Sequence, residues 1–352
     1  MNRDAIEHEP VLGGPVLSLL APRPGEVVVD ATLGHGGHSR MILGAIGPAG
    51  RLIAMDVDER NIARARDRLL AGHLPDPSLK NQEPGSSGLS PAPGEDRTQG
   101  EQPGERGPAA SQFPRLDIYR ANFAELDAVL DALEVPGVDV ILADLGVSTD
   151  QLLDPSLGLT FTEDGPLDMR LDDRLERTAA DLVNSLSETE LSDLIWNNSQ
   201  ERFSRRIAKR ICQVRREGRI KRTGELVRII LSAMGLREQS YLGRIHPATR
   251  TFLALRMAVN HELENLRALL EIAARRLKVG GRIGVISFHS GEDRVVKQDF
   301  LDRQKAGVYE IRTKKPVTAS REEVERNPRS RSAKLRVAEK VSPGDGRDAG
   351  PA

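Results

Sequence analysis

The chain has 352 residues, more than one hydrophobic core usually organises, so its length predicts two domains or one domain with large insertions. Hydrophobic residues make up 38% and charged residues 29%, which suits a soluble globular protein, and no apolar run approaches a membrane span. Residues 1–10 carry three acidic residues where a signal peptide needs an apolar stretch, so we expect a cytoplasmic protein. Cys212 is the only cysteine, which excludes an intramolecular disulfide and argues against a zinc site, so no metal is expected.

Residues 71–115 differ in composition from the rest of the chain. They contain eight prolines and seven glycines among Ser, Gln and charged residues, and almost no aliphatic side chains. Such a segment cannot bury enough apolar surface to fold, so we expect a disordered low-complexity insertion there and a disordered tail over 341–352. The segments on either side of the insertion are then expected to meet in space.

Four short apolar segments predict the strands of a sheet. They cover residues 26–31, 51–55, 138–143 and 282–288. Helix-compatible stretches follow the second strand, at 61–70, and precede the fourth, at 263–277. Strands that alternate with helices are typical of a parallel sheet with crossover helices. Carboxylates close the first three strands, at Asp30, Asp56 and Asp144.

Residues 152–240 have a different pattern, because their apolar residues recur at helical spacing without strand alternation. We therefore expect a helical subdomain over 152–240, inserted into an α/β domain formed by residues 1–151 and 241–340. Its charge is uneven, since residues 202–228 hold eleven Arg or Lys against two Glu. A second basic tract, 312–340, has ten basic and four acidic residues.

The segment after the first predicted strand is a glycine-rich turn that leads into a helix, where backbone amides can approach a ligand closely. Asp56 lies 20 residues after Gly36, a distance at which a carboxylate can accept hydrogen bonds from ribose hydroxyls. A dinucleotide site prefers a third glycine where this chain has Ser39, and Asp30 stands just before the loop. These departures favour S-adenosylmethionine over a nicotinamide dinucleotide. A glycine-rich turn without a ligand remains the alternative.

Seven motifs follow one another between His8 and about Lys340. They are HEPV at 8–11, DATLGHGGHS at 30–39, DLGVS at 144–148 with Gln151, GPLDMR at 165–170, HPATRTF at 246–252, SFHS at 287–290 with EDR at 292–294, and RSAKLR at 331–336. In this order they resemble the bacterial 16S rRNA cytosine-N4 methyltransferases. One departure is Gly291, where members of that family usually have leucine.

The resemblance implies a Rossmann-like methyltransferase domain, in which a mostly parallel sheet is flanked by helices, with an inserted all-helical subdomain. It implies methyl transfer from S-adenosylmethionine to the N4 amine of a cytidine in the decoding region of 16S rRNA (cytidine 1402). The implied partners are the small ribosomal subunit and its 16S rRNA, and the oligomeric state stays open, a homodimer included. The competing interpretation is a noncatalytic RNA-binding ribosome-assembly protein, against which Asp56, Asp144 and the intact glycine loop argue.

The resemblance also implies the site residues. The cofactor contacts fall on Gly36, Gly37, His38, Asp56, Phe123, Asp144 and Gln151. Asp144 is the catalytic candidate, because methyl transfer to an amine needs an acceptor for the amine hydrogens. The segment after Asp144 lacks the prolines and the aromatic ring of many amino-methyltransferases, so Asp168, Arg170 or residues 287–294 are expected to position the base. His289 is the second catalytic candidate, with an ordinary strand-end histidine as the alternative.

The basic residues of the helical subdomain predict the RNA surface, because that subdomain has no cofactor to hold. The predicted RNA-binding residues are Arg170, Arg202, Arg205, Arg206, Lys209, Arg210 and Arg294. A solvated helix face is the alternative for the cluster at 202–210. Trp196 and Phe203 are the candidates for stacking on bases.

Overall fold

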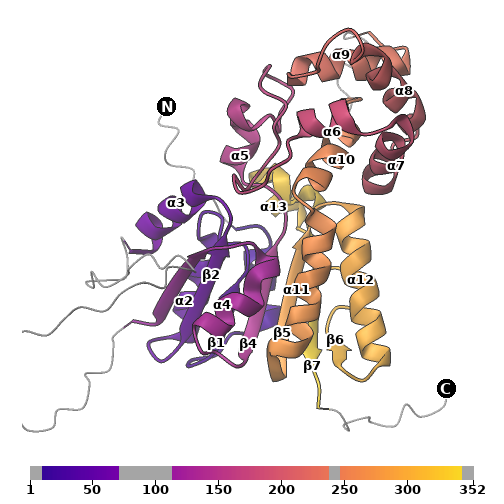
Figure 1. The fold of residues 1–352 in the computed structure, drawn as a ribbon. Coiled ribbons are helices and arrows are strands. Elements are labelled where there is room, and N and C mark those ends of the chain that lie inside the picture. The colour runs from indigo at the N-terminus through magenta and orange to yellow at the C-terminus, as the bar shows by residue number, and fades with distance from the viewer. Residues whose placement is uncertain (1–9, 71–112, 238–245, 343–352) are drawn as a thin grey trace, which may run out of the picture.

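The computed structural model describes residues 10–70, 113–237 and 246–342, which form an α/β part and a helical part (Figure 1). A seven-stranded sheet has the order β3-β2-β1-β4-β5-β7-β6. The strands are β1 (Val27–Asp30), β2 (Arg51–Asp56), β3 (Arg115–Arg120), β4 (Val138–Asp144), β5 (Leu277–Ser287), β6 (Tyr309–Ile311) and β7 (Lys334–Lys340). The first five pair in parallel, and β7 lies antiparallel between β5 and β6. The predicted Rossmann-like class is confirmed.

Helices cover both faces of this sheet. They are α1 (Gly13–Leu20), α2 (Gly37–Ile46), α3 (Glu59–Leu70), α4 (Leu126–Ala132), α11 (Glu262–Arg276) and α12 (Ser290–Lys305). Helices α1 to α3 share one apolar core with the sheet, and α4, α11 and α12 share another. Because β1, β2 and β4 are therefore buried on both faces, their sequences are continuous apolar runs without polar alternation.

The strand order reverses at β1, which pairs with β2 on one side and β4 on the other. In open α/β sheets, ligands bind outside the carboxyl ends of the strands at this switch point. The strands β1, β2 and β4 end at Asp30, Asp56 and Asp144 respectively. The fold therefore gathers the three predicted strand-end carboxylates at one edge of the sheet.

The helical part has its own apolar core. Its helices are α6 (Ala179–Ser185), α7 (Glu188–Ser199), α8 (Ser204–Val214), α9 (Thr223–Met234) and α10 (Thr249–Val259). Thr178 and Ser187 cap α6 and α7 with capping boxes. In each box the side chain of the capping residue accepts from the backbone N–H three residues later, and the side chain there accepts from the backbone N–H of the capping residue. Phe252 and Leu255 of α10 are buried in the same core as α7 to α9. The predicted end of the helical subdomain at residue 240 is therefore too early.

Five shorter elements complete the fold of the described residues. They are η2 (Phe123–Glu125), α5 (Thr149–Leu153), η3 (Pro155–Leu157), α13 (Arg321–Arg326) and η5 (Pro328–Ser332). In Figure 1, α5 and α13 lie where the helical part meets the sheet. Within the described ranges, no helix is both long and apolar enough to cross a membrane.

Two sequence predictions need correction. Of the predicted insertion, residues 71–112 lie outside the described residues, and Arg115 already begins β3, so its predicted end is too late. Strand β5 begins at Leu277, earlier than the predicted residue 282, and it includes Gly280 with a positive φ of 78°. The basic tract 312–340 contains β7, whose Arg336 is buried against Asp293. Most of the predicted tail, 343–352, lies outside the described residues.

Candidate functional site

A cavity of about 1040 Å³ opens at the carboxyl ends of the central strands. The glycine loop, Asp56, Phe123 and Asp144 line it from the α/β part, and Leu171 and Asp172 line it from the segment that precedes the helical core. Binding sites for single small molecules usually measure about 300 to 1000 Å³, so this cavity has room for a nucleoside cofactor and a second planar group.

The glycine loop turns sharply between β1 and α2. Gly34 and Gly36 have positive φ angles of 50° and 76°, which side chains rarely adopt. Gly34 and Gly37 line the cavity, whereas Gly36 faces α3, where a Cβ would lie 3.3 Å from the Cβ of Ala65. Gly36 therefore shapes the turn and packs the loop against α3, and its contact with the cofactor stays a prediction.

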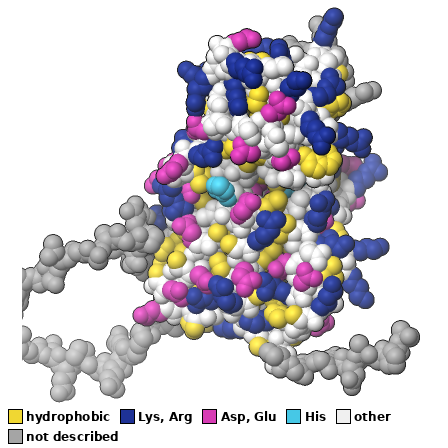
Figure 2. Space-filling model, turned by 45° about the vertical axis from the view of Figure 1, so that its right-hand side comes forward, with side chains coloured by type: hydrophobic (Ala, Val, Ile, Leu, Met, Phe, Trp, Pro, Cys, Tyr) yellow, Lys and Arg dark blue, Asp and Glu magenta, His cyan; other side chains and the backbone are white. Residues whose placement is uncertain are grey.

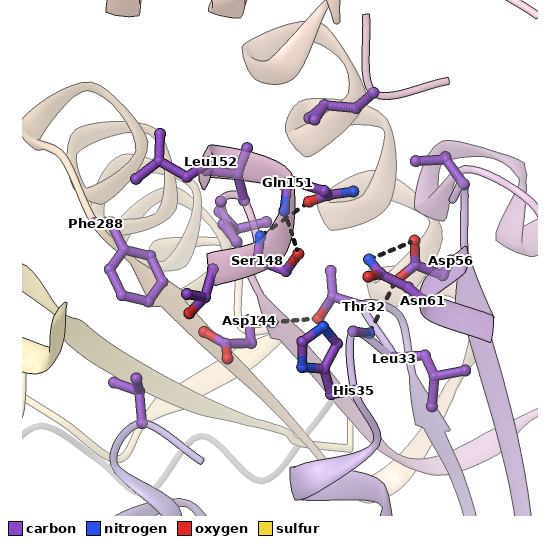
Figure 3. Close-up of a pocket in the computed structure, with 18 of the residues that line it drawn as sticks. Thr32, Leu33, His35, Asp56, Asn61, Asp144, Ser148, Gln151, Leu152 and Phe288 are labelled. Carbon is purple, nitrogen blue, oxygen red and sulfur yellow. Dashed lines mark hydrogen bonds between the residues drawn. The ribbon is translucent and has the colours of Figure 1, made fainter. Parts of the chain in front are cut away.

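Asp56 holds this loop against β2 (Figure 3). Its carboxylate accepts hydrogen bonds from the backbone N–H of Gly34 and of Asp58, both at 2.8 Å, and from the Asn61 amide at 3.3 Å. Burial raises the pKa of Asp56 to about 7, although these hydrogen bonds oppose the shift. Asn61, which also lines the cavity, was not identified from the sequence, since an asparagine in a first helical turn has no distinctive pattern.

Gln151 and Phe123, two of the predicted cofactor contacts, line the cavity. The side-chain oxygen of Gln151 accepts from the Ser148 N–H at 2.9 Å, and its amide donates to buried Asp58 at 2.9 Å. Gln151 therefore closes a capping box and ties α5 to the end of β2. Phe123 begins η2 after the capping residue Asn122, and its ring also packs against the core shared by α4 and α11.

Asp144, at the end of β4, has an oxygen without a hydrogen-bond donor. Its N–H donates to the Thr32 hydroxyl at 2.6 Å, and its Oδ2 lies 3.5 Å from Nδ1 of His38. Among the described residues, no donor reaches the buried Oδ1. Burial raises the pKa of Asp144 to about 6, the His38 charge opposes this, and the carboxylates of Asp30 and Glu292 add to it.

His38 and Ser39, at the start of α2, make different contacts. His38 lines the cavity, and its Nε2 lies 2.9 Å from the Val11 carbonyl, which fixes the ring. The Ser39 hydroxyl donates to Asp30 at 2.7 Å, and burial raises the pKa of Asp30. The serine that departs from the dinucleotide pattern thus satisfies a buried carboxylate.

His289 is not among the residues that line the cavity, and its catalytic role stays a prediction. Its Nδ1 accepts from the Glu292 N–H at 3.3 Å, and its Nε2 lies 3.2 Å from a Glu292 oxygen and 4.0 Å from Glu262. This is the cap of α12. The three side chains lie close enough to share a cation, but the buried guanidinium of Arg256 already pairs with Glu262 at 2.7 Å. Phe288 and Glu292 are the residues of this motif that line the cavity.

Three other candidates for positioning the base do not line the cavity: Asp168, Arg170 and Arg294. Arg170 forms a two-pronged ion pair with Asp168 at 2.8 and 2.9 Å, and neither residue lines the cavity. The guanidinium also donates to a backbone carbonyl, so it serves the fold of this loop. Arg294 is exposed, and Asp293 pairs with Arg336 and not with Arg294.

The predicted basic cluster forms an exposed face of α8. Arg205, Arg206 and Lys209 are exposed, as is Arg202 just before the helix, whereas Arg210 is half-buried. The Arg206 guanidinium lies 5.4 Å from the centroid of the Phe203 ring, and 40% of Phe203 is exposed. Figure 2 shows Lys and Arg side chains spread over the helical part, at the top of that view.

Other arginines of the 202–228 stretch hold the helical part together. Arg215 donates to two backbone carbonyls at the end of α6, and Arg219 and Arg222 pair with Asp181 and Asp164. The sequence could not separate these residues from the exposed ones, because their partners lie 29 to 58 positions away in the chain.

The chain is similar to methyltransferases. The model of the MraW methylase family matches residues 5–74 and 109–341. Ribosomal RNA small subunit methyltransferase H of Sorangium cellulosum is 43% identical over 335 residues, covering 95% of this chain and 91% of that protein. Its namesake from Geobacter sulfurreducens is 43% identical over 350 residues, covering 95% and 99%. A solved rRNA methylase from Streptococcus thermophilus is 10% identical, with a TM-score of 0.40, covering 95% of this chain and 99% of that one.

Proposed function

The chain belongs to the MraW methylase family, and we propose that it transfers a methyl group from S-adenosylmethionine to the N4 amine of a cytidine in the decoding region of 16S rRNA. It acts in the cytoplasm on the small ribosomal subunit. Curated relatives of 43% identity that span nearly the whole chain are named for methylation of small-subunit ribosomal RNA. The observation that carries the choice of an amine is the unpartnered Oδ1 of Asp144.

The cavity fits S-adenosylmethionine. Gly34 and Gly37 let the backbone form part of its wall, Asp56 is a carboxylate for the ribose hydroxyls, and Phe123 offers a flat apolar face for adenine. The carboxylates of Asp56 and Asp144 stand at the ends of β2 and β4, on either side of the switch point, so they suit the two ends of an elongated cofactor. When bound, the cofactor supplies an electrophilic methyl group on a positively charged sulfur.

Asp144 is suited to receive the amine hydrogens of the base. The amine nitrogen of cytosine is a weak nucleophile, because its lone pair is delocalised into the ring. An acceptor fixed beside that nitrogen localises the lone pair and stabilises the positive charge that develops there. Thr32 and His38 hold Asp144 in place, while its Oδ1 has no hydrogen-bond partner among the described residues.

Phe288 supplies the aromatic ring that the segment after Asp144 lacks. Its Cδ2 lies 3.3 Å from the position that a Cβ of Gly146 would occupy, so only glycine there lets the ring approach this closely. Figure 3 shows the ring beside Asp144, away from Asp56 and Asn61. A cytosine stacked on Phe288 would therefore present its amine near Asp144, and the base must leave its helix to reach this position.

The exposed basic face of α8 is suited to bind the RNA around that base. Its cationic side chains have no carboxylate partner among the described residues, and Arg206 with Phe203 offers a stacking surface.

Two measurements test this proposal. Calorimetry should show that S-adenosylhomocysteine binds and that NAD does not, because the loop lacks a third glycine for a pyrophosphate. Small subunits that lack the modification should then accept a labelled methyl group from S-adenosylmethionine. Binding of subunits without any transfer would favour the noncatalytic assembly protein.

A further inference from the structure

A short basic segment forms part of the cavity wall and has no role in the chemistry described above. It joins α13 to β7 through η5. The residues that line the cavity are Arg326, Asn327, Pro328, Arg329, Arg331 and Ser332. Arg331 is exposed to solvent while it lines the cavity, so this wall includes the cavity's rim.

The backbone of this segment is fixed at both ends. The Ser320 hydroxyl caps α13, and Glu323 accepts a hydrogen bond from the backbone N–H of Leu12 at 2.7 Å. Further along, Ser330 is completely buried, and its hydroxyl donates to the Asn327 carbonyl at 2.8 Å. Buried Ala333 then leads into β7. The neighbouring arginines are thus held on a rigid support, which lowers the entropic cost of binding a ligand.

Arg329 is a half-buried cation for which the described residues provide no carboxylate partner. Asp150, the carboxylate whose charge acts on Arg329, is paired with Arg64 and lies 3.5 Å from Nε2 of His35. Burial lowers the pKa of Arg329, and the Asp150 charge only partly offsets this. By contrast, the buried guanidinium groups of Arg282 and Arg336 each pair with a carboxylate at 2.7 Å. A partly desolvated cation of this kind is stabilised by an anion that arrives from outside.

We propose that Arg329 and Arg331 form a phosphate subsite at the rim of the cavity, which binds the RNA backbone next to the target nucleotide. This inference rests on the proposed function, because it requires RNA to enter the cavity. The cofactor's carboxylate is the other anion that could reach the cavity, but one half-buried guanidinium would suffice for it. The second arginine, exposed at the rim, suits a polyanion that continues into solvent.

Single alanine substitutions of Arg329 and Arg331 test the subsite. Arg321→Ala is the matched control, because Arg321 belongs to α13, is paired with Glu325 and does not line the cavity. For each lining arginine we expect a KM for small subunits about tenfold higher with kcat nearly unchanged, as for a lost backbone contact. The slope of log affinity against log salt should fall by roughly 0.7 to 0.9 per arginine. The control should match the wild type.

The outcomes separate the two anions and the two proposals. Wild-type KM and salt slope in both variants would overturn the subsite. Weaker binding of S-adenosylhomocysteine by Arg329→Ala, with an unchanged salt slope, would assign Arg329 to the cofactor's carboxylate. Arg329→Lys should recover part of the affinity for subunits, since it restores the charge without the two-pronged geometry. Binding of subunits is measured without methyl transfer, so a wild-type protein that binds but does not methylate would refute the proposed function and leave this test intact.

Discussion

Replacing Asp144 with asparagine should stabilise the protein while it abolishes most of its activity. The substitution keeps the shape of the side chain and one acceptor oxygen but removes the charge. Asp144 is half-buried near the carboxylates of Asp30 and Glu292, and among the described residues the charge that favours its ionised form is that of His38, at 3.5 Å. A carboxylate in this environment destabilises the folded wild-type protein, and the uncharged asparagine avoids this destabilisation.

The size and the pH dependence of this gain follow from the pKa. The pKa of Asp144 rises from 3.8 to about 6 on folding, and one pKa unit corresponds to about 1.4 kcal/mol. At pH 7.5 the wild-type carboxylate therefore lowers the free energy of unfolding by about 3 kcal/mol. Because the pKa is raised in the folded state, the carboxyl group costs the wild type no stability below pH 4. The cost grows as the pH rises toward 6. The advantage of the variant should thus fall to about half at pH 5.

Urea denaturation of Asp144→Asn and the wild type without cofactor, at pH 7.5 and pH 5, measures both quantities. Single-turnover methylation of small subunits should slow by about 10² to 10³, as for loss of a preorganised charge at the reacting centre. Subunit affinity should change little. Asp193→Asn, on the exposed surface of α7, is the control and should change neither property. A variant that is less stable than the wild type at pH 7.5, or equally fast, would refute the role given to Asp144.

Four further results are expected. Asp56→Ala should weaken S-adenosylhomocysteine binding by about 1.5 to 3 kcal/mol in calorimetry. Wild-type binding should tighten from pH 6 to pH 8, because the pKa of Asp56 is about 7 and ribose hydroxyls donate best to its charged form. Excision of residues 75–112 should leave methylation nearly intact, since the flanking α3 and β3 stay whole; a folded but inactive deletion would contradict this. Changing Arg205, Arg206 and Lys209 to Glu should weaken RNA binding and flatten its salt dependence without affecting cofactor affinity, and a wild-type salt slope would exclude α8 from the RNA surface.

The sequence predicted the central strands well, because they are buried on both faces and read as uninterrupted apolar runs. Each ends in a carboxylate, so the parallel topology alone brings Asp56 and Asp144 to one edge. Strand β7 was not found. Its Arg336 is buried only because Asp293, 43 positions earlier, neutralises it, and local charge patterns carry no sign of such a partner.

The candidate site was predicted in part for similar reasons. Strand-end and loop residues such as His38 and Phe123 follow motifs, and they do line the cavity. His289 follows a motif too, yet it caps α12, since the direction of a side chain after a strand depends on tertiary packing. Phe288 lies in the segment 287–294 that the sequence offered for positioning the base, although its approach to Gly146 depends on tertiary packing. Arg329 could not be selected from the sequence, because the groups around it, such as Asp150, are distant in the chain.

Analysis of the product nucleoside tests the central claim most directly. Small subunits that lack the modification would be incubated with the protein and S-adenosylmethionine carrying a heavy-isotope methyl group. The 16S rRNA would then be digested and its nucleosides and fragments identified by mass spectrometry. The proposed function predicts N4-methylcytidine from a single cytidine in the decoding region, and its loss in Asp144→Asn. A methyl group on another base, on carbon or on ribose, or no incorporation by a protein that binds S-adenosylhomocysteine, would contradict it.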